Sequence, residues 1–384
     1  MSGSLAPGLA RAPYLYSRMW WCVWVLLLAS TSVGAKFTVY WNSPTEVCHK
    51  FGIKINASAF GIIQNTRDHF YGDKVNIFYQ PGAFPWLNGS DPVNGGIPQN
   101  GNLADHIHVF IKELKKLPLN FSGVAVLDFE KYYPSLEMSP KEYRQASREW
   151  VAAAHPDWPP ARVESVAQLS FNQTARQFFQ ALLWVGRQLR PDALWGFYHY
   201  PYCENYGPGV GNCKPQVMEY NNEISWLIKM SQALYPSIYI FKNSGWDPQT
   251  RRLNTRGRLL EALRMRRRTG THMPILPYFW YRYHDDASLL SPIDVVNTLG
   301  FTKVLGLEGA VVWGSHNDVS SREKCLALQS YVDEQLGPLV QYLDQVPRSV
   351  LKTMIASRRL LKKLTIKVLK RTKKLHSGLT RPLQ

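Results

Sequence analysis

Gly123-Val-Ala-Val-Leu-Asp-Phe-Glu130 is an apolar run that ends in two carboxylic acids. Such a run predicts a β-strand, and side chains two positions apart on a strand point to the same side. Asp128 and Glu130 are therefore predicted to face the same way at the carboxyl end of the strand. Two carboxylates held this close cannot both ionise freely, which raises the pKa of one and provides a proton donor. The alternative is that Asp-Phe-Glu begins a loop and both carboxylates are solvated.

Predicted strands and helices alternate on both sides of this run. Besides residues 123–130, strands are predicted at residues 36–41, 75–79, 194–200, 236–241, 273–280 and 309–314. Helices are predicted at residues 103–117, 140–154, 175–189, 219–234, 256–268 and 292–305. Alternation of apolar strands with helices implies a parallel sheet covered by helices. At least seven such units without a glycine-rich phosphate loop favour a closed (β/α) barrel over a doubly wound nucleotide-binding fold.

The carboxyl ends of the predicted strands carry aromatic and polar residues. In a barrel these ends converge on the active site. Besides the two carboxylates they hold Tyr198, Tyr200, Tyr202, Tyr239, Tyr278, Tyr281, Trp313 and Ser315. Each aromatic residue alone is more often part of a core. Their recurrence favours a carbohydrate site, because the apolar faces of sugar rings stack on tyrosine and tryptophan while the hydroxyls form hydrogen bonds.

The N-terminus has the pattern of a secretory signal. Arg11 and Arg18 precede an apolar stretch at residues 19–28, which a run of small residues at 29–35 follows. Residues 1–35 are therefore predicted to be a cleaved signal peptide, and the protein is expected to be secreted into the extracellular space. A membrane anchor is the alternative, but a spanning helix needs about 20 apolar residues and this stretch is shorter.

Four cysteines remain once the signal peptide with Cys22 is removed: Cys48, Cys203, Cys213 and Cys325. An even number in an oxidising compartment predicts two disulfides, for which three pairings are possible. The short Tyr/Gly/Pro-rich loop at residues 204–212 favours the pair Cys203–Cys213, which leaves Cys48–Cys325. No CxxC or HExxH spacing is present, so neither a metal site nor a cofactor is predicted. Sequons for N-glycosylation stand at Asn56, Asn88, Asn120 and Asn172.

The formal net charge of +17 is unevenly distributed. Residues 345–384 contain 12 lysines and arginines and no acidic residue. We therefore divide the mature chain into a barrel at residues 36–345 and a basic tail at 346–384. Within the tail, residues 350–364 place apolar residues at roughly helical intervals among cations. This pattern predicts either an amphipathic helix that binds anionic surfaces or a solvated, disordered extension. Nucleic-acid binding is not predicted, because only the net charge supports it. A monomer is expected.

The strand ends belong to longer motifs that follow one another along the chain. They read Phe37-Thr-Val-Tyr-Trp-Asn-Ser-Pro-Thr-Glu-Val-Cys-His-Lys-Phe-Gly52, the run 123–130 with Pro134, Trp195-Gly-Phe-Tyr-His-Tyr-Pro-Tyr-Cys203, Leu234-Tyr-Pro-Ser-Ile-Tyr239, Leu276-Pro-Tyr-Phe-Trp-Tyr281 and Val311-Val-Trp-Gly-Ser315. From about Phe37 to Leu343 the chain resembles the hyaluronidases of glycoside hydrolase family 56, particularly the single-domain insect venom type. The resemblance implies a distorted (β/α) TIM-like barrel with one disulfide across the chain ends and another in the loop after Tyr202.

The resemblance also implies roles for individual residues. Glu130 matches the catalytic acid/base, and Asp128 matches the carboxylate that orients the acetamido group of the substrate. Tyr198, Tyr239 and Trp313 match residues around the N-acetylglucosamine ring. From the same strand ends we add Ser315, Tyr202 and Tyr278 as candidate substrate-binding residues. The implied partner is hyaluronan, with chondroitin as a second candidate. The implied mechanism is substrate-assisted and retaining, with the acetamido oxygen as nucleophile.

Three positions depart from the family pattern. Tyr132-Tyr-Pro134 stands where the family usually has Trp-Arg-Pro, so a cation that would meet the substrate carboxylate is missing. His316-Asn317 replaces the Ser-Asp of insect relatives, and Gln80-Pro-Gly82 replaces Asp-Pro-Gly. An alternative function follows from Tyr133, His316 and Asn317. The chain could be a glycosaminoglycan-binding protein that kept the barrel and lost turnover.

Overall fold

The computed structural model describes residues 36–207, 210–242, 245–357, 359–363, 365–366 and 368–369. The predicted signal peptide, residues 1–35, lies outside the described residues. The end of the predicted tail, from residue 370 onward, lies outside them as well. Within the described ranges, every helix is too short or too polar to cross a membrane.

Two parallel sheets form the centre of the fold. Their strand orders are β2-β1-β9-β8 and β3-β6-β7, and a separate antiparallel hairpin pairs β4 with β5. The strands are β1 (Thr38–Asn42), β2 (Ile63–Gln64), β3 (Val75–Tyr79), β4 (Trp86–Asn88), β5 (Asp91–Val93), β6 (Val124–Asp128), β7 (Leu194–Phe197), β8 (Tyr278–Trp280) and β9 (Gly309–Trp313). On one side the segment 234–237 joins the two sheets, through the parallel bridges Tyr198↔Tyr235 and Ser237↔Tyr278.

On the other side, a side-chain amide takes the place of strand pairing. Asn65 directly follows β2 and is buried. Its Oδ1 accepts hydrogen bonds from the backbone N–H groups of Lys74 (2.8 Å) and Val75 (2.9 Å), and its Nδ2 donates to the Val75 carbonyl at 2.9 Å. Asn65 therefore connects the first sheet to the start of β3. The result is the predicted (β/α) barrel, distorted where Asn65 replaces regular pairing.

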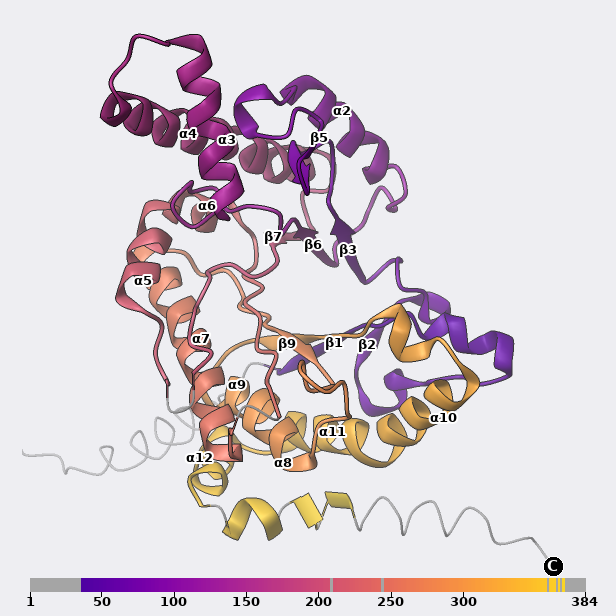
Figure 1. Ribbon diagram of the computed structural model, residues 1–384. Coiled ribbons are helices and arrows are strands. Elements are labelled where there is room, and N and C mark those ends of the chain that lie inside the picture. The colour runs from indigo at the N-terminus through magenta and orange to yellow at the C-terminus, as the bar shows by residue number, and fades with distance from the viewer. Residues whose placement is uncertain are drawn as a thin grey trace, which may run out of the picture. The chain divides into compact units, whose positions relative to one another are not determined.

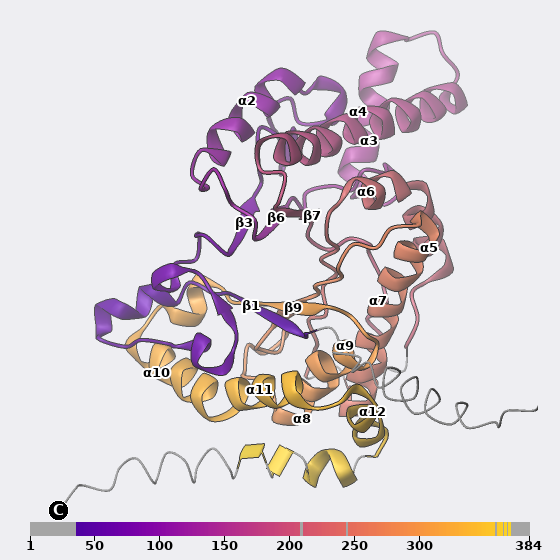
Figure 2. The ribbon, with the colours of Figure 1, turned by 180° about the vertical axis from the view of Figure 1, so that it is seen from behind.

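Helices surround the two sheets (Figures 1 and 2). In both views α2 and α4 lie outside β3, β6 and β7, whereas α10 and α11 lie outside β1 and β9. The α-helices are α2 (Leu103–Leu114), α3 (Lys141–Ala154), α4 (Pro160–Leu189), α5 (Pro215–Glu223), α6 (Ser225–Met230), α7 (Pro248–Thr269), α8 (Pro292–Val295), α9 (Phe301–Val304), α10 (Arg322–Tyr331), α11 (Gly337–Gln345) and α12 (Arg348–Ala356). Short 3-10 helices are η1 (Thr45–Phe51), η2 (Ala57–Phe60), η3 (Thr66–Asp68), η4 (Pro98–Asn100) and η6 (His316–Val319), and π-helical turns are η5 (Val296–Gly300) and η7 (Val332–Leu336).

Several predicted helices differ from the observed ones. The helix predicted at 256–268 is α7, which already begins at Pro248, and the one predicted at 292–305 is divided into α8, η5 and α9. The predicted helix at 175–189 is only the second half of α4, which begins at Pro160. Its first half buries little more than Val163, Ala167 and Phe171, a spacing too sparse to stand out in the sequence. The single helix predicted at 219–234 is wrong, because the chain forms α5 and α6, separated at Ile224, whose backbone leaves the helical region (φ −88°, ψ 19°).

The strands near β8 are shorter than predicted. Of the strand predicted at 236–241, Ser237 alone takes part in a described bridge, and the one predicted at 273–280 pairs continuously only over Tyr278–Trp280. Pro236, Pro274 and Pro277 interrupt these segments. Proline has no N–H to donate, so it breaks the ladder of hydrogen bonds.

Both predicted disulfides are confirmed. Cys48 in η1 is bonded to Cys325 in α10, 277 residues later, and Cys203 is bonded to Cys213. The first bond ties the N-terminal part of the barrel to its C-terminal helices. The sequons stay predictions: Asn56, Asn88 and Asn120 are exposed, whereas Asn172 is half-buried in α4.

The first part of the predicted tail packs on the barrel. In α12, Leu351 and Ile355 are buried and belong to the same core cluster as the barrel helices. Arg348 Nε donates to the Val304 carbonyl at 2.6 Å, which anchors the start of the helix to α9. The segment therefore does form an amphipathic helix, α12, but the apolar face of this helix packs on the barrel. Packing continues past the boundary that we predicted at residue 345.

We expect Asn65→Ala to lower the free energy of unfolding by about 3 kcal/mol or more. The substitution leaves the backbone groups at Val75 without partners, and each buried unsatisfied group costs about 1–3 kcal/mol. Urea unfolding followed by circular dichroism measures the change. Gln64→Ala is the control, because that amide donates one hydrogen bond, to the Ile55 carbonyl, and its loss should lower stability by only about 1 kcal/mol. Equal losses in the two variants would contradict a special role for Asn65 in closing the barrel.

Candidate active site

The alternation of side-chain directions along β6 places Asp128 on the inner face of the barrel. Val124 and Val126 belong to the apolar cluster inside the barrel, whereas Leu127 and Phe129 belong to the cluster between strands and helices. Because successive side chains on a strand point to opposite faces, Asp128 continues the inner row. The register of β3 against β6 sets Tyr79 opposite Asp128.

A cavity of about 370 Å³ opens at the carboxyl ends of the strands. Asp128 and Glu130 both line it, as the spacing of the two carboxylates predicts. The aromatic residues that line it include Tyr79, Tyr198, Tyr239, Tyr278, Trp280 and Trp313, which we call the aromatic wall. The solvated-loop alternative is therefore wrong for Asp128, which is 8% exposed.

The two carboxyl groups occupy different environments. Burial, and then the nearby charge of Glu130, raise the pKa of Asp128 well above its ordinary value. The side chain of Glu130 forms a hydrogen bond with Asp128, and no other group of the described residues donates to Asp128 Oδ1. The side chain of Glu130, in contrast, is 57% exposed to solvent. One carboxyl is thus poised to receive a donor from a ligand, and the other can exchange protons with water.

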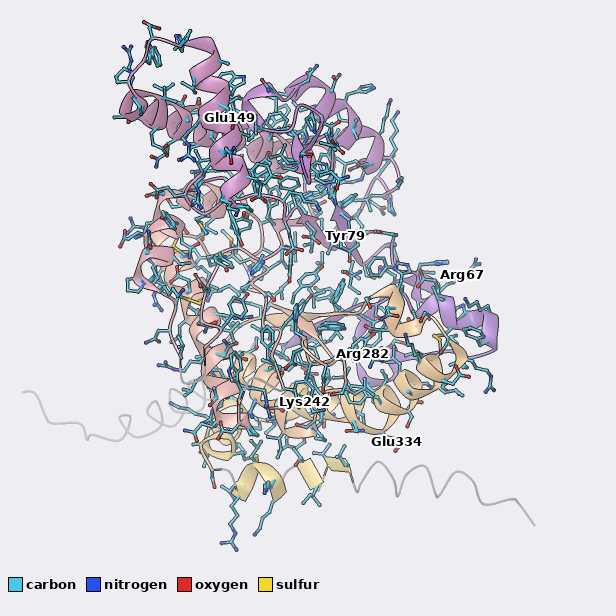
Figure 3. All side chains as sticks on the ribbon, viewed as in Figure 1. Arg67, Tyr79, Glu149, Lys242, Arg282 and Glu334 are labelled. Carbon is cyan, nitrogen blue, oxygen red and sulfur yellow. A yellow bond between two sulfur atoms is a disulfide. The ribbon has the colours of Figure 1, made fainter. Side chains whose placement is uncertain are left out.

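The aromatic wall is held by contacts between strands of the two sheets. Trp313 Nε1 at the end of β9 donates to the Tyr79 hydroxyl at the end of β3, at 2.8 Å; Tyr79 is labelled in Figure 3. The Trp313 ring is stacked on Tyr239, with ring centroids 5.8 Å apart, and Trp280 lies edge-on to Trp313 at 5.3 Å. Burial raises the pKa of the Tyr79 and Tyr239 hydroxyls, which keeps them protonated as hydrogen-bond donors. Flat apolar faces beside hydroxyl groups suit a sugar ring.

A buried guanidinium supports this wall from behind. Arg258 on α7 is 3% exposed, and its Nη1 donates to the carbonyls of Ser237 (3.2 Å) and Tyr239 (3.1 Å). Its Nε donates to Asn205 Oδ1 at 3.0 Å. Burial lowers the pKa of Arg258 from its ordinary value. Arg258 therefore fixes the backbone that presents Tyr239 to the cavity.

Comparisons with known proteins agree with this geometry. The pattern of the family Glyco_hydro_56, described as hyaluronidase, matches residues 29–353. The chain belongs to glycoside hydrolase family 56, the hyaluronidases. It is 38% identical to the hyaluronidase of Apis mellifera over 322 residues, which are 80% of this chain and 84% of that protein. It is 36% identical to hyaluronidase B of Vespa velutina, over 79% of this chain and 95% of that protein.

Solved hyaluronidases share the fold. A crystal structure of bee venom hyaluronidase in complex with a hyaluronic acid tetramer matches with a TM-score of 0.77 and 37% identity. The match covers 80% of this chain and 99% of that chain. A second crystal structure of the bee venom enzyme matches with a TM-score of 0.75 and covers all of that chain. The predicted fold class, family and enzyme type are confirmed.

The structure brings most of the predicted site residues together. Tyr198, Tyr239, Tyr278 and Trp313 line the cavity with the two carboxylates. Ser315 does not; it is the N-cap of η6, where its side chain and that of Asp318 form a capping box. Tyr202 lines a second cavity of about 480 Å³, which also contains Tyr133.

Sequence analysis missed several residues of the cavity, among them Tyr79, Trp280, His199 and Arg258. Tyr79 and Trp280 end β3 and β8, so the rule that strand ends build the site could have found both. His199 stands inside a quoted motif, between two tyrosines that were singled out. Arg258 had no signal, because one arginine among the many of α7 looks like surface charge.

The positions that depart from the family pattern lie around the cavity rather than among its lining residues. The Tyr133 ring packs on Tyr202, with centroids 5.2 Å apart. His316 lies edge-on to Phe70 at 5.7 Å. Asn317 accepts two hydrogen bonds from Lys324 Nζ, at 2.8 and 2.9 Å.

We expect Asp128→Asn to stabilise the fold above neutral pH. A carboxyl whose pKa is raised by folding favours the folded state below its unfolded pKa, and this contribution is lost as pH rises through the folded pKa. The amide cannot ionise, so it avoids the burial of a charge at high pH. Thermal unfolding of the variant and the wild type is measured at pH 4 and pH 8. The unfolding temperature of the variant should exceed that of the wild type by more at pH 8 than at pH 4.

Asp157→Asn is the control for this measurement, because Asp157 is exposed. The midpoint temperature of its thermal unfolding should equal that of the wild type at both pH values. A loss of stability in Asp128→Asn at pH 8 would contradict the raised pKa.

Proposed function

We propose that this hyaluronidase hydrolyses the β-1,4 N-acetylglucosaminide links of hyaluronan from within the chain, with retention of anomeric configuration. The observation that carries the proposal is the pairing of a buried carboxyl, Asp128, with an exposed one, Glu130, in an aromatic cavity. The bee venom relative was crystallised in complex with a hyaluronic acid tetramer.

In the proposed first step, Glu130 acts as the general acid. The acetamido oxygen of the substrate attacks the anomeric carbon, the glycosidic bond breaks, and the leaving oxygen takes the proton of Glu130. Asp128 Oδ1, to which no N–H group of the described residues donates, accepts the acetamido N–H and stabilises the positive charge that develops on this group. No protein carboxylate is needed as the nucleophile.

In the proposed second step, Glu130 acts as the general base. Water attacks the anomeric carbon from the side that the leaving group vacated and gives its proton to the Glu130 carboxylate. The bond to the acetamido oxygen breaks, which restores the acetamido group. Two inversions at one carbon give net retention. The solvent exposure of Glu130 supports the entry of this water.

The alternative function, a binding protein without turnover, has less support. Tyr133, His316 and Asn317 do not line the cavity that holds Asp128 and Glu130. Changes at these positions therefore leave the residues of the proposed chemistry in place. We expect these positions, which lie around the cavity, to affect substrate specificity rather than the chemical steps.

We expect Glu130→Gln to reduce turnover of hyaluronan by at least roughly 10²–10⁴-fold, because both proton transfers are lost. Binding should persist, since the amide keeps the shape of the side chain. The release of reducing ends is measured in parallel on hyaluronan and chondroitin, with the wild type and the variant. This assay gives the turnover rates and shows which of the two polysaccharides the enzyme prefers. Asp128→Asn should also reduce the turnover of hyaluronan, and this variant should remain folded.

Proton NMR of the first products tests the stereochemistry. The retained anomer should appear first and then mutarotate. An inverted first product, or near-normal turnover by Glu130→Gln, would refute the mechanism. Binding without release by the wild type would favour the alternative function.

We also propose that the chain is secreted and that its basic tail binds anionic surfaces. The two disulfides support secretion, because such bonds persist in oxidising compartments. Lys352, Arg359, Lys362 and Lys363 are exposed near the C-terminus. With the apolar face of α12 turned to the barrel, the proposed contact with an anionic surface rests on these charges.

We expect replacement of these four cations by glutamine to lower the salt concentration at which the protein elutes from a dextran sulfate column. The slope of log affinity against log salt should also flatten, because fewer counterions are released. A matched control removes the same charge elsewhere, at the exposed Lys112, Lys115, Lys116 and Lys141. An equal effect in the control would mean that net charge, rather than the tail, governs binding.

A further inference from the structure

Two tryptophans of the aromatic wall stand side by side on neighbouring strands. Trp280 ends β8 and Trp313 ends β9, and the register of these parallel strands pairs the two residues directly. Their rings meet edge-on, with centroids 5.3 Å apart and planes inclined by 69°. The two indoles therefore form a corner of the cavity.

The polar N–H of each indole is bound by a protein partner. Trp313 Nε1 donates to the Tyr79 hydroxyl at 2.8 Å, and Trp280 Nε1 donates to Asp318 Oδ2 at 2.9 Å. An indole has a single donor and no acceptor. Because both donors are engaged, the corner presents apolar ring surface to a ligand, which suits the apolar face of a sugar.

Asp318 is held in place independently of the indole. The residue lies in η6, after β9, and only 4% of its side chain is exposed. Its Oδ2 also accepts the backbone N–H of Ser315 at 2.9 Å, and its Oδ1 lies 2.9 Å from Arg282 Nε in an ion pair. Arg282, which is labelled in Figure 3, is itself held, because its Nη1 donates to the Ala287 carbonyl at 2.7 Å. The segments that follow β8 and β9 therefore fix this carboxylate together.

We propose that Asp318 is a positioning residue for the aromatic wall, which fixes the orientation of the Trp280 ring and thereby strengthens the binding of the sugar in the cavity. The inference rests on the proposed function, in which a sugar ring of hyaluronan occupies the cavity. The torsion that turns an aromatic ring about its bond to Cβ has broad minima, so packing alone leaves the indole some freedom. A hydrogen bond to a charged acceptor is roughly twice as strong as a neutral one, and it holds the ring in one orientation.

Removal of the acceptor should weaken the binding of the sugar. We expect Asp318→Ala to raise the dissociation constant for a hyaluronan tetramer roughly two- to tenfold, because the Trp280 ring then leaves its stacking position part of the time. Isothermal titration calorimetry measures this affinity in a Glu130→Gln parent, so that the tetramer stays intact under the proposed mechanism.

Glu308→Ala is the matched control for this measurement. Glu308 lies directly before β9, as Asp318 lies after it. Its carboxylate likewise accepts from an arginine, Arg266 Nη1 at 2.8 Å, and from a backbone N–H, that of Ile275 at 2.9 Å. The control should lose stability and keep the affinity of the parent for the tetramer. An equal loss of affinity in the control overturns the proposal.

A double-mutant cycle separates positioning from general destabilisation. Trp280→Phe keeps an aromatic ring at this position but has no N–H to donate. In that background Asp318→Ala should change the affinity by less than about twofold. Its cost in stability, measured by urea unfolding, should remain, since the contacts of Asp318 with Ser315 and Arg282 are lost in either background. The same loss of affinity in both backgrounds would show that Asp318 does not act through the indole.

A variant of the same size provides a test if Asp318→Ala does not fold. Asp318→Asn keeps one oxygen but no charge, so the hydrogen bond from the indole becomes a weaker, neutral one. The NMR resonance of Trp280 Nε1–H, identified by its absence from the spectrum of Trp280→Phe, should move in Asp318→Asn and stay in place in Glu308→Gln. A resonance that does not move in Asp318→Asn contradicts the proposal.

Binding by the Glu130→Gln parent distinguishes failure of this inference from failure of the proposed function. A parent that does not bind the hyaluronan tetramer refutes the proposed function, and the inference falls with it. If the parent binds and Asp318→Ala leaves its affinity unchanged, the role of Asp318 alone is refuted.

Discussion

Burial of a carboxyl group at the inner end of a parallel strand is the constraint on which the site depends. The inner row of β6 places Asp128 behind Val124 and Val126, where water cannot fully solvate its charge. Such a group is stabilised by a donor or by a neighbouring proton. Because no N–H group of the described residues donates to Asp128 Oδ1, the cavity is prepared for one that a ligand brings. Glu130, two residues later on the same side, is left in reach of solvent.

The contacts that shape the cavity also hold the barrel together. Regular pairing between β2 and β3 is missing, and Asn65 bridges the sheets there through the backbone of Val75. At the cavity itself, the hydrogen bond from Trp313 to Tyr79 joins the end of β9 to the end of β3. Arg258 ties α7 to the segment that carries Tyr239. A wall built in this way has little freedom to move, which suits a site that must hold a sugar ring in one orientation.

The basic residues of this protein occur in two different settings, the C-terminal segment and the cavity. Most of the excess of lysine and arginine lies in the last forty residues. In the part of this segment that the structure describes, the apolar side of α12 covers the barrel, and Lys352, Arg359, Lys362 and Lys363 are exposed. At the cavity, the nitrogen-bearing side chains of Arg258 and His199 have fixed positions. Arg258 is fixed by carbonyl groups, and His199 stands beside Glu130 in a conformation that its backbone alone would disfavour.

The sequence by itself determined the strand and helix alternation, the carboxylate pair and the Cys203–Cys213 disulfide, because these follow from periodicity and spacing along short stretches. The Cys48–Cys325 pair, 277 residues apart, followed only as the pair that remained. Only the tertiary structure decided which carboxyl is buried, since the depth of a strand end depends on segments far away in the chain. It also decided that Ser315 caps a turn and Tyr202 lines another cavity, and that Arg258 and His199 belong to the site. The amphipathic pattern of residues 350–364 illustrates what sequence periodicity cannot predict. Periodicity identifies an apolar face, but what that face packs against is set by the surface that the rest of the chain presents.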